Sequence, residues 1–210
     1  MTKMLYQGHG SYRFVLNDGT VVYVDPFAGE GYDLPADLIL STHEHFDHTA
    51  FDKMPHAPGC TIIRAKDLHP SVDDYSESLE SHGVVITSVQ AYNKNHPKAE
   101  CVGYLLDFDY VRFYASGDTS TTEDMESGFL ADMCIDYAVF PCDGFYNMDR
   151  AEASRCASMV KARHSIPIHM VPMDDPTNPS QLFDRTRAEE FQAPGRIILA
   201  PGEEIELVHS

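Results

Sequence analysis

Three histidines and Asp47 stand in one six-residue segment, His43-Glu44-His45-Phe46-Asp47-His48. Imidazole nitrogens and carboxylate oxygens are donors that zinc, manganese and iron take in proteins. In an extended chain His43 and His45 point to the same side, and a helical turn after them would bring Asp47 and His48 to face a neighbouring point. The spacing therefore indicates a metal site, with ligands for two ions rather than one.

A histidine-rich surface turn, with Asp47 capping the next helix, is the alternative interpretation of this segment. Three further residues of ligand type favour the metal site: His96, Asp118 and His169. The last two follow apolar runs at residues 111–115 and 166–168, as the first cluster follows the run at residues 38–40. Because the ends of parallel strands meet at one edge of a sheet, these side chains are expected to converge.

The order of these residues resembles the metallo-β-lactamase superfamily, in which a His-x-His-x-Asp-His segment precedes a lone His, a Gly-Asp and a late His. Further motifs are similar to the subgroup that includes ascorbate-6-phosphate lactonase and many uncharacterised metal-dependent hydrolases: Gly8-His9-Gly10-Ser11, Val24-Asp25-Pro26-Phe27, Ala91-Tyr92-Asn93, His96-Pro97-Lys98 and Val102-Gly103-Tyr104. The resemblance runs the length of the chain. It implies an α/β fold, the four-layer αββα metallo-β-lactamase-like sandwich.

The resemblance also implies two divalent metal ions, zinc or manganese, with iron as a further candidate. It assigns three ligands to each ion and one to both: His43, His45 and His96 to the first, Asp47, His48 and His169 to the second, and Asp118 to both. A carboxylate can bridge two ions, whereas imidazole cannot. Asp47 and Asp118 are therefore the expected catalytic carboxylates. Ions about 3.5–4 Å apart share a water and lower its pKa toward neutrality.

Five other residues are expected to support the ions or to contact substrate: His9, Asp25, Lys94, Lys98 and Tyr146. Asp25 would orient a ligand histidine through its second ring nitrogen, and would also suit a turn before proline. His9 is expected to line the site rather than bind an ion. Lys94 and Lys98 either are simply solvated or suit a phosphate or carboxylate substrate. His96, in a loop, has substrate contact as its alternative role.

The chain of 210 residues carries a formal net charge of −18. An acidic surface disfavours nucleic-acid binding, which depends on basic groups that displace counterions. No apolar run approaches the ~20 residues of a membrane span, and the N-terminal residues lack the apolar core of a signal peptide. The five cysteines show no paired pattern. We therefore expect a cytoplasmic protein with a small-molecule substrate and no nucleic-acid or membrane partner. A homo-oligomer is compatible with the sequence.

The length indicates a single domain over residues 1–210. The turn sequence at residues 17–20 predicts a hairpin between two apolar segments. Further strands are expected at residues 61–65, 197–199 and 205–208, and helices at residues 71–81, 150–162 and 180–191. The alternation of strands and helices favours a β-sandwich with helices outside, built from two similar halves that meet near residue 110.

The leading functional hypothesis is a binuclear hydrolase, in which a metal-bridged hydroxide attacks an ester, lactone or phosphoester bond of a small, anionic substrate. A β-lactam is disfavoured because no secretory signal is present, and nuclease activity is disfavoured by the acidic charge. An iron-dependent oxidative enzyme of the same fold and a metal-binding protein without catalysis are the alternatives. The presence of every ligand position argues against the last of these.

Overall fold

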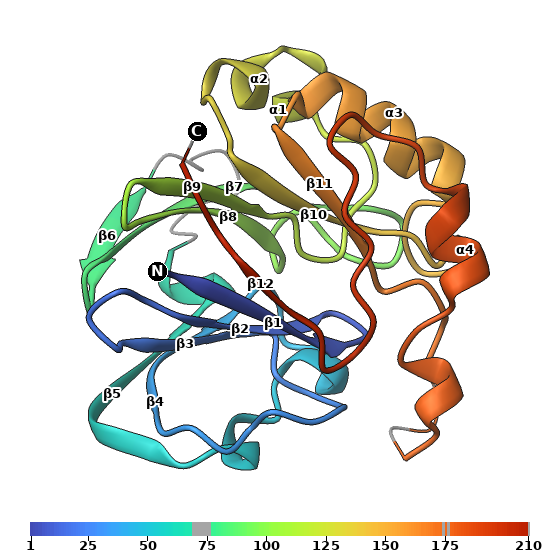
Figure 1. The fold of residues 1–210 in the computed structure, drawn as a ribbon. Helices are drawn as coiled ribbons and strands as arrows, with labels where there is room; N and C mark the ends of the chain where they lie inside the picture. Colours follow the sequence, from blue (N-terminus) through green and yellow to red (C-terminus); the bar gives the residue numbers. More distant parts are fainter. Residues whose placement is uncertain (69–76, 174, 176, 210) are drawn as a thin grey trace.

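The computed structural model describes residues 1–68, 77–173, 175 and 177–209, and its framework is a pair of six-stranded sheets packed against each other (Figure 1). The first sheet has the order β12-β1-β2-β3-β4-β5, with strands Glu204–Glu206, Lys3–Gly8, Ser11–Val15, Val21–Val24, Ala36–Ser41 and His56–Arg64. The second has the order β11-β10-β9-β8-β7-β6, with strands His164–Ile168, Tyr137–Pro141, Val111–Ala115, Val102–Phe108, Val84–Gln90 and Ser78–Ser81. Each sheet contains both parallel and antiparallel strand pairs.

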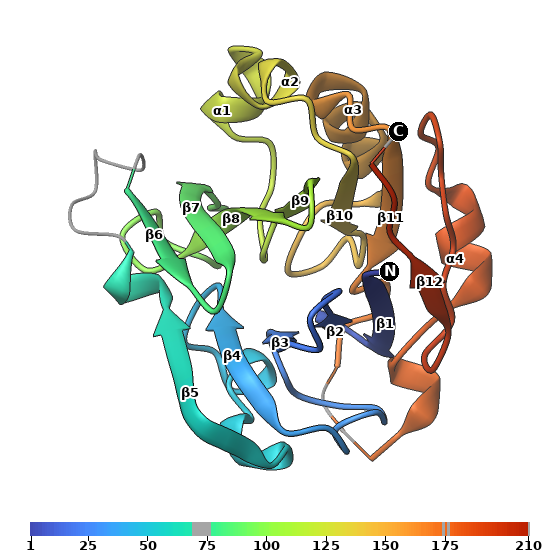
Figure 2. The same cartoon turned by 60° about the vertical axis from the view of Figure 1, so that its left-hand side comes forward.

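Helices lie over the outer face of the second sheet (Figures 1 and 2). They are α1 (Glu123–Glu126), α2 (Phe129–Asp132) and α3 (Arg150–Val160), while α4 (Arg185–Glu190) contacts α3 and lies at the side of the sandwich. The outer face of the first sheet, which includes Tyr23 and Ile39, packs instead on Phe51 of the single-turn helix η2 (Phe51–Lys53) and on Met54. The arrangement is the α/β sandwich expected from the sequence, with single-turn helices and loops in place of a full helical layer on one side.

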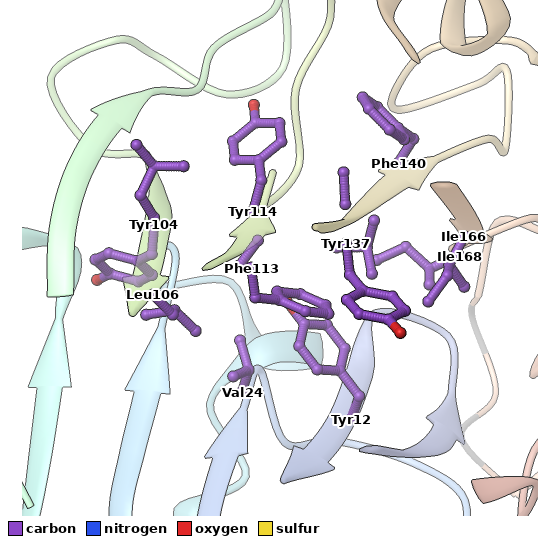
Figure 3. Close-up of a cluster of buried hydrophobic side chains, with 14 of the residues drawn as sticks. Tyr12, Val24, Tyr104, Leu106, Phe113, Tyr114, Tyr137, Phe140, Ile166 and Ile168 are labelled. Atoms are coloured by element: carbon purple, nitrogen blue, oxygen red, sulfur yellow. The ribbon is translucent and has the colours of Figure 1, made fainter. Parts of the chain in front are cut away.

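Strand alternation explains which side chains fill the space between the sheets. Phe113 of β9 faces the first sheet, and its ring lies 5.6 Å from that of Tyr12 and 4.9 Å from that of Phe14, both on β2. The next residue, Tyr114, points to the opposite face of β9, as Figure 3 shows, and its ring contacts Phe140 on the helix side. All five of these rings are fully buried, so one continuous core holds the two sheets and the helices together.

Parallel strands in both sheets end at the same edge of the sandwich. β3, β4 and β5 run parallel in the first sheet, and β9, β10 and β11 run parallel in the second. Polar segments follow five of these strands directly: Asp25 after β3, residues 42–48 after β4, residues 116–119 after β9, residues 142–144 after β10 and His169 after β11. The expected convergence of strand ends is therefore present, and it sets the position of the site.

Several element predictions differ from the structure. Residues 78–81 form the edge strand β6 rather than part of a helix, while residues 71–76 of that prediction lie outside the described residues. Residues 197–199 form no strand, and the helix expected at residues 180–191 is replaced by the single turn η4 (Pro179–Gln181) and the shorter α4.

The chain changes sheets between β5 and β6, whereas residue 110 lies in the β8–β9 turn within the second sheet. The prediction of two halves meeting near residue 110 is therefore wrong, because the β8–β9 hairpin keeps both strands in one sheet. The predicted hairpin around residues 17–20 is confirmed as β2 and β3. None of the helices in the described ranges combines the length and apolar character that crossing a membrane requires.

Candidate metal centre

The first group of ligand-type side chains consists of His43, His45 and His96. Each offers one ring nitrogen, and these nitrogens lie within 4.8 Å of one another. His43 and His45 follow β4 in extended chain and sit on the same side, with ring centroids 4.6 Å apart. His96 comes from the loop before β8, where its centroid lies 4.9 Å from that of His43 and 4.8 Å from that of His45. His43 and His96 are buried, and His45 is exposed.

The second group consists of His9, Asp47, His48 and His169, whose ligand atoms also lie within 4.8 Å of one another. Asp47 and His48 belong to the single-turn helix η1 (Phe46–His48), which turns the chain away from His43 and His45. The backbone N–H of His169 donates to the carbonyl of His9 at 2.8 Å, which joins the β11 end to the β1–β2 turn. His9 Nε2 lies 3.1 Å from Asp47 Oδ2, so His9 is a member of the group rather than only a lining residue.

Asp118, which follows β9 after the turn at Gly117, lies between the two groups. Its Oδ2 is 3.3 Å from Nε2 of His96 in the first group and 3.4 Å from Nε2 of His169 in the second. Its Oδ1 is 3.6 Å from Nε2 of His48. The carboxylate is buried, and it occupies the position from which one side chain can contact an ion in either group.

Four buried histidines of the two groups have the ring nitrogen Nδ1 next to an oxygen outside the centre. The pairs are His43 with Thr42 Oγ1 at 3.0 Å, His48 with Asp25 Oδ2 at 3.1 Å, His96 with Asn93 Oδ1 at 2.9 Å and His169 with Asp143 Oδ2 at 3.2 Å. An oxygen at Nδ1 fixes the orientation and tautomer of an imidazole, which leaves Nε2 to face inward as a ligand. This pattern is typical of histidines that bind metal ions.

The inward nitrogens fit a bound cation. Nε2 of His43, His48 and His169 is buried, with no hydrogen-bond partner among the described residues. An unpaired buried nitrogen costs free energy that a metal–ligand bond would offset. The donor set combines imidazole with carboxylate, which suits zinc, manganese and iron alike. These residues could therefore hold one divalent ion in each group.

The charges of the centre are strongly coupled. Burial lowers the pKa of His43 and of His96. Burial alone would also lower the pKa of His48, but the carboxylates of Asp118 and Asp25 outweigh it and raise that pKa to about 10. Against burial, the neighbouring histidines hold the pKa of Asp118 well below its ordinary value. A proton on His48 thus balances the neighbouring carboxylates in the absence of cations, and binding cations would release it.

Backbone geometry brings the second group together at a local cost. His9, Asp25 and His169 have φ values of 54°, 48° and 47°, in the left-handed region that L-residues seldom adopt. Such conformations persist where the surrounding fold enforces them, and they concentrate at functional sites. Gly10 gives the necessary space, because a Cβ at this position would lie 2.9 Å from Cε1 of His48.

A cavity of about 360 Å³ opens over the two groups. Its lining residues are His45, Phe46, Asp47, Asn95, His96, Asp118, Tyr146, His169 and Met173. Tyr146 is therefore at the cavity, as predicted. Lys94 lines a neighbouring cavity of about 440 Å³ that also contains Tyr146. Lys98 lies 5.7 Å from the ring centroid of Tyr92, and the described linings of the two cavities do not include it. Neither lysine is among the described residues that line the cavity over the metal groups.

Three residues of this centre were not predicted from the sequence: Asn93, Asp143 and Asn147. Nδ2 of Asn147 donates to Oδ2 of Asp118 and to Oδ2 of Asp143, both at 2.9 Å, and its Oδ1 accepts from Nδ2 of Asn93 at 3.0 Å. Asn93 and Asp143 face His96 and His169, so Asn147 links the central carboxylate to one histidine of each group. The signal that could have indicated Asp143 is its place just after the apolar strand β10 (Tyr137–Pro141), which resembles the place of Asp118 after β9.

Comparisons with known proteins agree with this geometry. Residues 3–169 match the family model described as the β-lactamase superfamily domain. The chain is 27% identical over 229 residues to a UPF0173 metal-dependent hydrolase of Thermococcus kodakarensis, covering 99% of this chain and 100% of that one.

Solved structures share the fold. The novel metallo hydrolase Igni18 of Ignicoccus hospitalis superposes with a TM-score of 0.71 at 18% identity, covering 98% of each chain. The diiron β-hydroxylase CmlA of Streptomyces venezuelae superposes with a TM-score of 0.66 at 14% identity, over 98% of this chain and 54% of that one. At these identities the likeness concerns the fold alone, whereas the family model covers most of the sequence. The chain therefore belongs to the metallo-β-lactamase superfamily.

Proposed function

We propose that this protein is a binuclear metal-dependent hydrolase that cleaves an ester, lactone or phosphoester bond of a small substrate. The observation that carries the proposal is the position of Asp118 between two groups of inward-facing ligand atoms, at the floor of a cavity. Two divalent ions bound there would lower the pKa of a water molecule toward neutrality and offset negative charge that develops on the substrate. The name of the Thermococcus relative supports the reaction class.

Each residue of the centre has a role in this proposal. His43, His45 and His96 would hold the first ion, and Asp47, His48 and His169 the second, with His9 as a further ligand or as the residue that orients Asp47. Asp118 would bind both. Asp25, Asn93 and Asp143 hold the imidazoles in one orientation, which keeps the ligand atoms preorganised.

Zinc and manganese are the proposed ions, with iron as a further candidate, because the mixed nitrogen and oxygen donors suit all three. Membership of the subgroup that includes ascorbate-6-phosphate lactonase stays a proposal that rests on the motifs around His9, Asp25 and His96. A cytoplasmic location is likewise proposed, supported by the five cysteines, all of which are free thiols. The inference of an anionic substrate rests on the lactonase-like motifs and on Lys94 and Lys98. Neither lysine is among the described residues that line the cavity over the metal groups, so the motifs are its remaining support.

An oxidative reaction at an iron centre is the second candidate function. The diiron β-hydroxylase CmlA shares the fold, and the same histidine and carboxylate ligands would serve iron. The two candidates differ in what they require. A hydrolase needs only water and works with zinc or manganese, whereas the oxidative reaction needs redox-active iron and oxygen.

Removal of metal should abolish hydrolysis without unfolding the protein. We expect the wild-type chain, after dialysis against a chelator, to lose at least about a hundredfold in kcat/KM on a panel of esters, lactones and phosphodiesters. Added zinc or manganese should restore the activity under nitrogen. Circular dichroism before and after chelation checks that the fold persists. Full activity in the metal-free protein would contradict the proposal, and recovery with iron and oxygen alone would favour the oxidative candidate.

A further inference from the structure

We propose, on the basis of the hydrolase function above, that the substrate is uncharged and carries an aromatic or other apolar group that lies against Phe46, Tyr146 and Met173, next to the bond that is cleaved. The floor of the cavity is polar and belongs to the metal groups. Its rim contains these three apolar side chains. A cavity of about 360 Å³ is small for a ligand site, so the bond and the apolar group must lie close together.

Phe46 and Tyr146 expose aromatic surface at the cavity. The exposed fraction is 66% for Phe46 and 43% for Tyr146, and large exposed apolar side chains that gather at a cavity are typical of binding sites. Phe46 is the first residue of η1, which also carries Asp47 and His48. The position of the Phe46 ring is therefore set relative to the second metal group. A side chain that selects the substrate needs such a fixed position.

The ring of Phe46 and the backbone of Tyr146 are held in place by neighbours, and the ring of Tyr146 packs edge-on against that of Phe145 at 4.7 Å between centroids. The ring of Phe46 packs edge-on against that of Phe27, at 5.5 Å between centroids. The backbone N–H of Tyr146 donates to Oδ1 of Asp143 at 2.6 Å, and its carbonyl accepts from Nδ2 of Asn95 at 2.9 Å. Aromatic surfaces that are ordered before binding lose little conformational entropy when a ligand covers them.

The apolar surface continues beyond the first cavity. A second cavity of about 220 Å³ is lined by Phe145, Tyr146, Pro172, Met173 and Gln181. It shares Tyr146 and Met173 with the first cavity, and four of its five lining residues have apolar or aromatic side chains. A longer apolar group on the substrate would extend in this direction.

Charge argues against an anionic substrate. No lysine or arginine is found among the described residues that line the first cavity, and the carboxylates of Asp47 and Asp118, as ligands, would offset part of the charge of the two proposed ions. The net charge of −18 also repels anions from the molecule as a whole. Lys94 and Glu152 line the neighbouring cavity of about 440 Å³, which also has Tyr146 in its lining. An anionic substituent would therefore lack the cationic side chain that normally receives it.

Three ethyl esters that differ only in one substituent test the charge and the apolar contact together. The metal-loaded enzyme should hydrolyse ethyl phenylacetate with a kcat/KM roughly tenfold above that for ethyl propionate, and should hydrolyse monoethyl malonate more slowly than either. Phe46→Ala and Tyr146→Ala should each remove most of the preference for phenyl. Phe129→Ala, at a phenylalanine exposed to 42% on α2, is the matched control and should leave the preference unchanged.

Binding provides a readout that does not depend on turnover. In a ligand-observed NMR titration of the metal-loaded protein, phenylacetamide should bind roughly tenfold more tightly than acetamide, and Tyr146→Ala should remove this difference. Equal binding of the two amides, or a faster reaction with monoethyl malonate that Lys94→Ala slows, would overturn the inference. Failure to cleave any ester, lactone or phosphoester, with phenylacetamide still preferred, would instead overturn the hydrolase proposal alone. Metal analysis of each variant confirms that the centre is intact.

Discussion

Replacement of Asp118 by Ala should remove at least one metal ion per chain and lower kcat/KM by roughly a thousandfold or more, with the fold retained. Asp118 is the only described carboxylate within 3.4 Å of a ring nitrogen in each group, through His96 and His169. Without it, neither ion has the shared oxygen ligand that couples the two groups. The activity loss follows because the proposed centre would lose the carboxylate that holds both ions, and with it the pair of ions that together would activate water and offset the developing negative charge.

Metal content by mass spectrometry and kcat/KM should be measured on the same preparation of Asp118→Ala. Asp52→Ala is the matched control, because Asp52 is exposed on η2, close in sequence to the first cluster and outside both metal groups. The control should keep the metal content and the activity of the wild type. An Asp118→Ala protein that retains all of its metal would exclude a bridging role for this carboxylate.

Asp25→Ala should lower the free energy of unfolding by about 3 kcal/mol and weaken metal binding by about 10–100-fold. The buried Asp25 carboxylate accepts from the backbone N–H of Thr42 and from Thr42 Oγ1, both at 2.8 Å, and also faces Nδ1 of His48. Its removal leaves buried donors unpaired beside both metal groups. Thermal unfolding should show a Tm lower by roughly 6–12 °C, and calorimetry should show weaker zinc binding.

Two further variants separate stability from metal binding. Asp25→Asn keeps an acceptor for Thr42 N–H and tolerates the left-handed backbone, so it should restore much of the stability but not the contact with His48. Asp37→Ala removes a similar hydrogen bond, in which the Asp37 carboxylate accepts from the backbone N–H of Val21, away from the centre. It should cost about 1 kcal/mol with metal binding unchanged. Wild-type zinc affinity in Asp25→Ala would show that this carboxylate does not position His48.

The sequence allowed the core of the site to be predicted because its ligands follow apolar strands. Asp118 and His169 come after β9 and β11, and His43 comes after β4. Parallel strands end together, so residues far apart in sequence could be expected to meet. His96 lies in a loop, so its orientation depends on contacts with Asn93 that are made within a single turn and that strand ends do not predict.

The hydrogen bonds of Asn147 with Asn93 and Asp118 could not be predicted from the sequence, for a physical reason. Its partners Asn93 and Asp118 are 54 and 29 residues away, and only the folded chain places the three side chains within hydrogen-bond distance. The contact of His9 with Asp47 was beyond sequence analysis in the same way. This contact depends on a left-handed backbone in the β1–β2 turn, which a histidine between two glycines did not reveal.

The wrong element predictions concern segments whose conformation depends on distant partners. Residues 78–81 are strand because Ser78 to Ser81 pair with Thr87 to Val84 along β7. Residues 197–199 look apolar enough for a strand, yet the nearby pairing is limited to the isolated bridge between Ser165 and Arg196. The helix expected at residues 180–191 breaks before Asp184, whose side chain accepts from Arg187 N and begins α4 there.

The metal content of the wild-type protein tests the central proposal most directly. Native mass spectrometry of the intact chain, purified without added metal and then titrated with zinc or manganese, counts bound ions regardless of substrate. We expect two ions per chain, which matches the two groups of ligand atoms on either side of Asp118. A mass equal to that of the metal-free chain, with no uptake of zinc, manganese or iron, would contradict a binuclear centre.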